Sequence, residues 1–250
     1  MIRVLFFIFT FFFSFSLLAA DYSSVDERAK NVPVIYERNL KTLVRYLIEP
    51  YKGDDVLKTR AIYAWIASHV EYDMYKYNVI MGNKKSYRGV GDLKTGDAFK
   101  SRVGVCGDIA DLFLRMAKAA NLKVDLITGY AGYDLTMDNF KEARHAWNAV
   151  NIKGKWYFVD ATWAMGGDYR TFENVRSHIE HRREIRRKKQ KKENRINDLR
   201  EINDRWFLVP PEKMIETHFP EREKQQYSNR PVDMKKVFRE NARKLKRKKK

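Results

Sequence analysis

Apolar residues recur at three- and four-residue steps over two stretches in the first third of the chain. Between Pro33 and Pro50 this spacing predicts a helix that the first proline opens and the second ends. A second helix follows, capped by Asp54 or Asp55. Its predicted buried face consists of four side chains: Ile62, Trp65, Ile66 and Val70. The glycine-containing stretch from Tyr72 to Phe99 lacks such a pattern, and it predicts an irregular connection.

A third helical pattern begins at a cysteine. In "VGVCGDIADLFLRMAK", residues 103–118, apolar residues at helical spacing predict a helix from Cys106 to a left-handed stop at Asn121. Cys106 precedes the apolar stripe and falls in the first turn, where free N–H groups and the helix dipole stabilise a thiolate. Gly104 and Gly107 on either side are expected to leave room for a substrate backbone.

Alternating apolar and polar residues later predict strands. After "VDLITGYAGY", the segment "RHAWNAVNIKGKWYFVDATW" predicts strands over 143–152 and 155–162, joined at Lys153-Gly154. If Ile152 pairs with Lys155, Asp160 lies diagonal to His145 on the same sheet face. A register longer by one residue would move Asp160 to the other face and separate the two side chains.

Positive charge is concentrated in two segments. The formal net charge is +18, but residues 235–250 hold ten Lys/Arg against one Glu, and residues 176–205 hold twelve against six Asp/Glu. The inner segment predicts a protruding charged helix or helical hairpin. The terminal run of like charges predicts a disordered or at most transiently helical tail, suited to an anionic surface such as a membrane or cell envelope. Nucleic acid fits that charge equally, but we expect export to make it the least suitable partner.

The N-terminus predicts that export. Arg3 precedes an apolar run from Val4 to Leu18 and the small pair Ala19-Ala20, which is typical of a signal peptide over 1–20. An uncleaved membrane anchor is the alternative. Cys106 is the only cysteine, whereas exported proteins mostly use cysteines in pairs. The lone thiol therefore indicates a reactive group or an intermolecular bridge, against the plainer alternative of an inert buried side chain.

The sequence contains three residues of the types that acyl transfer by a thiol needs. Cys106 supplies a nucleophile, His145 a base and Asp160 a carboxylate that orients the base. The segments that carry them resemble signature blocks of the transglutaminase-like superfamily, which shares the papain-like cysteine-protease core. The blocks are "TRAIYAWIASHVEYD", "GVCGDIADLF" and "RHAWNAVNIKGKWYFVDATW". The segment "RWFLVPPEKMIETHFP" is most similar to the kyphoscoliosis-peptidase type.

The resemblance implies an α+β fold in which N-terminal helices and the nucleophile helix pack on an antiparallel sheet. It divides the chain into a signal peptide or anchor (1–20), N-terminal helices and an irregular connection (21–93), a catalytic core (94–173), a charged helical insertion (174–204), the C-terminal part of the core (205–232) and a basic tail (233–250). Trp147 and Trp163 match aromatic positions expected to pack around the site. No metal or cofactor is expected, because the calcium-binding elements of the animal enzymes are not recognisable in this sequence. The resemblance provides no side chain for an oxyanion hole, so only the backbone N–H of Cys106 is expected to serve there.

The implied activity is that of an exported thiol enzyme acting on protein or peptide amides. Cys106 is expected to be the nucleophile, His145 the general base and acid, and Asp160 the orienting carboxylate of a reaction through a thioester. Hydrolysis would make the protein a peptidase or deamidase. Two alternatives stay open: transfer to an amine, as in a crosslinking transglutaminase, and an inactive protease-like binding module held by its basic tail.

Overall fold

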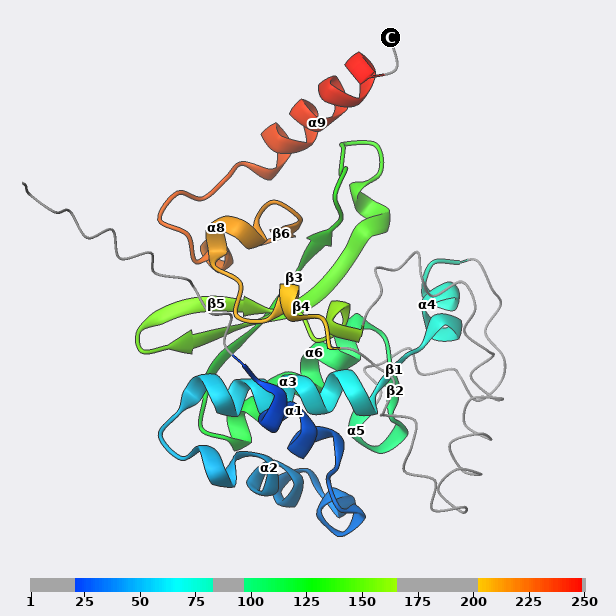
Figure 1. Cartoon of the computed structure of the whole chain (residues 1–250). Helices are drawn as coiled ribbons and strands as arrows, with labels where there is room; N and C mark the ends of the chain where they lie inside the picture. Colours follow the sequence, from blue (N-terminus) through cyan, green and yellow to red (C-terminus); the bar gives the residue numbers. More distant parts are fainter. Residues whose placement is uncertain (1–20, 83–96, 166–201, 249–250) are drawn as a thin grey trace, which may run out of the picture.

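The computed structural model describes residues 21–82, 97–165 and 202–248, and it has the predicted α+β class (Figure 1). Its α-helices are α1 (Ser23–Lys30), α2 (Leu40–Ile48), α3 (Asp55–His69), α4 (Met74–Ile80), α5 (Ala98–Ser101), α6 (Cys106–Ala119), α8 (Pro211–Met214) and α9 (Met234–Lys248). Its strands are β1 (Glu71–Tyr72), β2 (Val103–Gly104), β3 (Lys123–Ala131), β4 (Arg144–Ile152), β5 (Lys155–Val159) and β6 (His218–Pro220). Short 3-10 helices are η1 (Val34–Arg38), η2 (Glu49–Tyr51), η3 (Phe140–Ala143), η4 (Trp163–Met165), η7 (Asp204–Trp206) and η8 (Glu223–Gln226).

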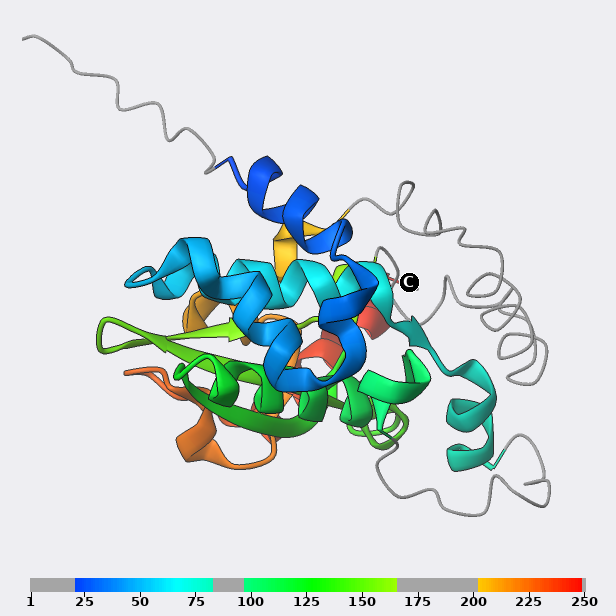
Figure 2. The same ribbon diagram turned by 90° about the horizontal axis from the view of Figure 1, so that it is seen from below.

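The larger sheet has the strand order β5-β4-β3-β6, and all three pairings are antiparallel. A parallel pair, β1 with β2, lies beside the start of α6. Helix α6 packs against β3 and β4, while α1, α2 and α3 form a layer beyond it (Figure 2). The predicted packing of the cysteine helix on an antiparallel sheet is therefore confirmed.

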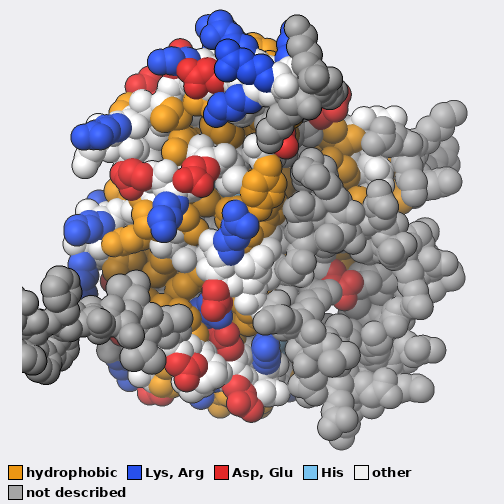
Figure 3. All heavy atoms as spheres, turned by 45° about the horizontal axis from the view of Figure 1, so that its top comes forward, with side chains coloured by type: hydrophobic (Ala, Val, Ile, Leu, Met, Phe, Trp, Pro, Cys, Tyr) orange, Lys and Arg blue, Asp and Glu red, His pale blue; other side chains and the backbone are white. Residues whose placement is uncertain are grey.

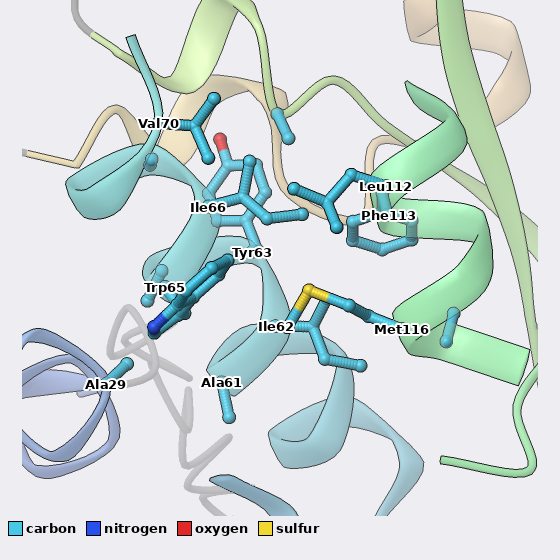
Figure 4. Packing of buried hydrophobic residues seen from close by; sticks show 14 of the residues in the cluster. Ala29, Ala61, Ile62, Tyr63, Trp65, Ile66, Val70, Leu112, Phe113 and Met116 are labelled. Atoms are coloured by element: carbon cyan, nitrogen blue, oxygen red, sulfur yellow. The ribbon is translucent and has the colours of Figure 1, made fainter. Parts of the chain in front are cut away.

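Helix α3 lies at the centre of the helical layer. Its predicted buried face is correct, since Ile62, Trp65, Ile66 and the following Val70 are all fully buried. Burial extends further than one face, because every side chain from Thr59 to Ser68 is enclosed by neighbouring elements. Figure 4 shows side chains of α3 meeting α6 on one side and Ala29 of α1 on another. A helix covered on several sides has no polar face, so its apolar residues need not follow a single stripe.

The hairpin of β4 and β5 has the predicted register. Ile152 pairs with Lys155, and both turn residues have positive φ, 50° at Lys153 and 89° at Gly154. This is the geometry of the tight turn that suits a twisted antiparallel pair. The second strand ends at Val159, earlier than predicted, because the backbone of Asp160 donates instead to the Trp206 carbonyl.

Two connections are more ordered than the sequence pattern predicts. The helix expected between Pro33 and Pro50 is divided into η1 and α2 at Asn39, whose side chain caps α2 by accepting from the Thr42 N–H at 2.9 Å. The stretch expected to be irregular after Tyr72 contains α4 before the undescribed residues 83–96 and α5 after them. Both helices begin at an aspartate, a preferred N-cap residue type.

The basic tail differs most from its prediction, because α9 is a helix docked on the core. Phe238 is fully buried, and its ring lies 4.9 Å from that of Phe219 and 5.4 Å from that of Phe140. Asn241 also donates to the Leu135 carbonyl at 3.0 Å. This apolar anchoring offsets the repulsion between like charges that predicts disorder. Lys and Arg side chains gather around this end of the molecule in Figure 3.

Other expectations fall outside the described residues. The predicted signal peptide (1–20) does so entirely, as does nearly all of the predicted helical insertion (174–204). Within residues 21–82, 97–165 and 202–248, no helix combines the length and the apolar character that a membrane crossing requires. The far end of the insertion is described, and there Asp204 forms an ion pair with the buried Arg60 of α3.

Candidate active site

Helix α6 begins at Cys106, as the sequence pattern predicts, and the thiol is free. Asp108, in the first turn, accepts a hydrogen bond from the Val105 N–H at 3.0 Å and an ion-pair contact from Lys76 at 2.8 Å. This side chain therefore fixes the chain entering the helix and holds the helix terminus in place. The N-terminal end of a helix favours negative charge, which suits a thiolate there.

The flanking glycines have different surroundings. A Cβ on Gly107 would meet nothing within 4 Å, which fits the expectation of open space beside the sulfur. A Cβ on Gly104 would lie 2.7 Å from Cβ of Asp108 and 3.3 Å from Cβ of Ala98. Gly104 is therefore required by protein packing, and the expectation that it makes room for a substrate is wrong.

The histidine and the aspartate of the hairpin lie together. His145 Nε2 is 2.6 Å from Oδ2 of Asp160, and Asp160 is fully buried. The other carboxylate oxygen, Oδ1, accepts from the backbone N–H groups of Thr162 at 2.8 Å and Trp163 at 3.0 Å. The turn after β5 thus holds Oδ1 of Asp160 by hydrogen bonds and leaves Oδ2 to bond with the imidazole.

The imidazole of His145 lies close enough to the Cys106 thiol to lower the pKa of the thiol. Because Nε2 of the ring already contacts Asp160, Nδ1 is the nitrogen left for the sulfur. The backbone N–H of Ala146 also lies near the sulfur and contributes to the lowered pKa of Cys106. The structure therefore places His145 in hydrogen-bond contact with Asp160 and close to the Cys106 thiol, so the three predicted residues are neighbours.

The electrostatic environment of Cys106, His145 and Asp160 favours a charged thiolate–imidazolium pair. Burial opposes ionisation of the thiol, but the hydrogen bond and charge of His145 lower the pKa of Cys106 below its usual value. Burial likewise opposes charge on the imidazole, yet Asp160, followed by Cys106, raises the pKa of His145 to about 10. Despite burial, His145 and His218 together hold the pKa of Asp160 well below its usual range. An imidazolium and a carboxylate are the expected forms of His145 and Asp160 near neutral pH, and their arrangement shifts Cys106 toward the thiolate.

Tyr72 is a neighbour that the sequence did not reveal. Strand β1 pairs with β2 so that Tyr72 lies opposite Gly104, two residues before the cysteine. Its hydroxyl oxygen faces the backbone N–H of Cys106, which can donate to it, and the hydroxyl also lies beside the thiol. Burial raises the pKa of Tyr72 well above its usual value, so the hydroxyl keeps its proton. A second hydrogen-bond donor therefore lies next to the one backbone N–H expected at an oxyanion site.

His218 is a second residue that the sequence did not single out. It lies on β6, is fully buried, and places Nε2 3.0 Å from the same Oδ2 of Asp160 that contacts His145. Strand β6 is only three residues long and follows Asp160 by 58 positions, so neither periodicity nor a turn motif indicates the contact. The one feature of the sequence that could have indicated a role for His218 is its position inside the segment similar to the kyphoscoliosis-peptidase type.

Comparison with known proteins places this arrangement in a family. Residues 41–161, which include Cys106, His145 and Asp160, match the family model of the transglutaminase-like superfamily. These residues form a transglutaminase-like domain. Kyphoscoliosis peptidase of Mus musculus is 28% identical over 216 residues, covering 85% of this chain and 28% of that protein. The Homo sapiens protein of the same name is 27% identical over 224 residues, covering 88% and 29%.

The chain thus spans less than a third of the length of these curated relatives. Among solved structures, the crystal structure of a TGase matches with a TM-score of 0.40 at 19% identity, covering 59% of this chain and 36% of that one.

The described residues of the chain contain one group of three residues of metal-ligating types. Ligand atoms of His145, Asp160 and His218 lie within 4.8 Å of one another. Hydrogen bonds account for this closeness, since both Nε2 atoms contact one carboxylate oxygen and backbone N–H groups occupy the other. We therefore treat the group as a hydrogen-bonded relay and assign no metal to it.

Proposed function

We propose that this chain is a thiol enzyme that hydrolyses protein or peptide amides through Cys106, His145 and Asp160. One observation carries the proposal: the hydrogen bond of His145 to the buried Asp160, beside the Cys106 thiol at the start of α6. A nucleophile, a base and a group that fixes the base's tautomer are the parts that amide cleavage by a thiol needs. The match of residues 41–161 to the transglutaminase-like superfamily supports the same chemistry.

The reaction follows from the positions of these groups. The Cys106 thiolate attacks the amide carbon, and the carbonyl oxygen becomes negative beside the Cys106 N–H and the Tyr72 hydroxyl. The C–N bond then breaks as the His145 imidazolium gives its proton to the leaving amine or ammonia. A thioester remains, and His145, now neutral, takes a proton from water as the water attacks the thioester. The products are a carboxylic acid and the regenerated thiol, with Asp160 ionised throughout.

Support for water as the acceptor comes from the relatives, which are named as peptidases. An amine in place of water would form a new amide, and the protein would then be a crosslinking enzyme. An inactive binding module is the remaining alternative. The contact between thiol and imidazole, together with a lowered pKa of Cys106, favours an active enzyme over that module.

An assay with a glutamine-containing peptide separates these outcomes. The wild-type chain and the Cys106→Ala variant are incubated with the peptide, with and without an amine donor such as a lysine derivative. Ammonia release or backbone cleavage without the donor, absent in Cys106→Ala, is the expected result. If the amine is incorporated in preference to hydrolysis, the protein is a transferase and not a hydrolase. No product above the Cys106→Ala level across varied peptides would overturn the proposal.

We propose that the protein is exported, on the basis of the N-terminal pattern of residues 1–20. N-terminal sequencing of the mature chain from expressing cells tests this, and Asp21 is the expected first residue. Recovery of the full-length chain from the cytoplasm would contradict it.

We propose that α9 binds anionic surfaces of the membrane or cell envelope. Over residues 234–247 the helix has seven Lys/Arg against one Glu, while Phe238 anchors it to the core. Sedimentation with vesicles containing anionic lipid should capture the protein in a salt-sensitive manner, and vesicles of neutral lipid should not. A variant with Lys244, Lys246 and Arg247 changed to Gln keeps the anchor and should lose most of this binding. Equal capture of this variant would contradict the assignment.

A further inference from the structure

His218 is a fully buried histidine that the reaction above does not use. It reaches the site from β6, through pairing with Ala131 of β3. We propose that His218 is a positioning residue: its Nε2–H holds Oδ2 of Asp160 in place so that the carboxylate can orient His145. This inference rests on the proposed function, because it concerns the same thiol, imidazole and carboxylate.

The contacts of His218 determine its tautomer. An ionised carboxylate can only accept hydrogen bonds, so the Nε2 atom 3.0 Å from Asp160 must carry the proton. Nδ1 of a neutral ring is then an acceptor, and the Thr217 hydroxyl lies 2.8 Å from it. Burial lowers the pKa of His218 to about 4, with the charge of Asp160 opposing this shift, so the ring is neutral at neutral pH. His218 thus donates to Asp160 without adding a positive charge.

Aromatic packing keeps the ring of His218 in this orientation. The ring centroids of three tryptophans lie 5.0 Å, 4.6 Å and 5.2 Å from that of His218; these are Trp147, Trp163 and Trp206. Such tight packing leaves a buried ring few alternative rotamers. Trp147 and Trp163, which match aromatic positions of the family pattern, therefore act on the site through His218 as well as through His145.

Asp160 needs this additional contact because it lies past the end of β5. The backbone N–H groups of Thr162 and Trp163 bond only to Oδ1, and the hydrogen bonds of Oδ2 come from His145 and His218. His145 itself is the group to be oriented, so it cannot also fix the carboxylate independently. The donor on β6 supplies the missing second point of attachment for Oδ2.

Among the described residues, three titratable groups besides His218 act on Asp160 or on its partner His145. His145 faces it from β4, Cys106 lies beyond His145 on α6, and Tyr63 faces it from α3. Burial raises the pKa of Tyr63 well above its usual value, as it does for Tyr72 beside the thiol, so both stay neutral up to pH 9. Titration of Cys106 is therefore governed by His145, and the state of His145 depends on how well Asp160 is placed.

The test measures the alkylation rate of the thiol by iodoacetamide from pH 4.5 to pH 9 in the full-length chain. Cys106 is the only cysteine, so the label reports on one site. His218→Leu removes the donor and should move the rate profile toward that of a free cysteine, with a fall of at least ~10-fold at pH 6. His218→Gln can place an amide N–H near the position of Nε2, and it should stay within ~3-fold of wild type. Thermal melting of both variants checks folding.

Three results would be informative in different ways. A wild-type profile retained in His218→Leu would overturn the positioning role, as would an equal loss in both variants. A His145→Ala variant separates this failure from failure of the proposed function. If the wild type and His145→Ala both react like free cysteine, the activated thiol itself is refuted, whatever His218 does.

Discussion

Replacement of Asp160 by Asn changes the site while preserving its local fold. The amide oxygen can still accept from the Thr162 and Trp163 N–H groups that now hold Oδ1. The amide nitrogen takes the place of Oδ2 and donates where the carboxylate accepted. His145 must then accept at Nε2, which moves its proton to Nδ1, the atom facing the thiol. An imidazole in that tautomer cannot take the proton of Cys106.

The size of the effect follows from the electrostatics of His145. Its pKa of about 10 against an ordinary 6.5 corresponds to about 5 kcal/mol of preference for the imidazolium form. Asp160 is the largest favourable contributor to this preference, followed by the Cys106 thiolate. Without the carboxylate we expect the charged pair to revert to neutral thiol and neutral imidazole. Turnover should fall by about 10³- to 10⁴-fold, as expected for loss of the orienting carboxylate in such a triad.

Two measurements check this prediction: initial rates with the peptide substrate, and iodoacetamide alkylation of Cys106 at pH 6. Both should fall in Asp160→Asn while the near-ultraviolet circular dichroism spectrum is unchanged. Asp125→Asn is a matched control, because Asp125 is a hydrogen-bonded carboxylate of β3 whose partners are Tyr227 and Gln225. A folded Asp160→Asn protein within ten-fold of wild type in both assays would refute the reasoning.

Three further predictions concern neighbouring groups. Tyr72→Phe should slow peptide turnover by about 10²-fold, because it removes an oxyanion donor. The same variant should change the rate of iodoacetamide alkylation by less than ~3-fold. An equal effect on both rates would contradict the oxyanion role. Gly129→Ala should lower the melting temperature and reduce the free energy of unfolding by about 1–3 kcal/mol or more. The reason is that the added Cβ would lie 2.2 Å from the Phe219 carbonyl oxygen. An unchanged denaturant unfolding curve would refute this prediction. His218 has a pKa of about 4 in the folded state, below its unfolded value near 6.5, so the unfolded state binds more protons between these pH values. Relative to His218→Gln, the wild type should therefore lose up to about 3 kcal/mol of stability as pH falls from 6.5 to 4, and parallel pH profiles of the two unfolding free energies would contradict the shift.

The part of the site that could be predicted from the sequence is the part that local geometry determines. His145 and Asp160 are only 15 residues apart, and a two-residue turn sets the register between their strands. Cys106 lies ahead of an apolar stripe in its own helix, so its place in the first turn is also a local property. Periods of 2 and 3.6 residues are sufficient for both inferences.

Tyr72, His218 and α9 could not be predicted because they depend on pairing between distant segments. Strands β1 and β6 have two and three residues, too few to show any alternation. The charge run of α9 predicts disorder when taken by itself, and only the packing of Phe238 against Phe219 and Phe140 reverses that expectation. Such contacts depend on which surfaces the folded core presents, and a single sequence does not display them.

The measurement that tests the central claim most directly is the pH dependence of Cys106 alkylation in the wild type and in His145→Ala. A thiol paired with an imidazolium reacts as a thiolate at pH values well below the free cysteine pKa of about 8.5. We predict that the wild-type rate stays high down to about pH 6, and that His145→Ala shows the profile of free cysteine. Identical profiles in the two proteins, both matching free cysteine, would contradict the account.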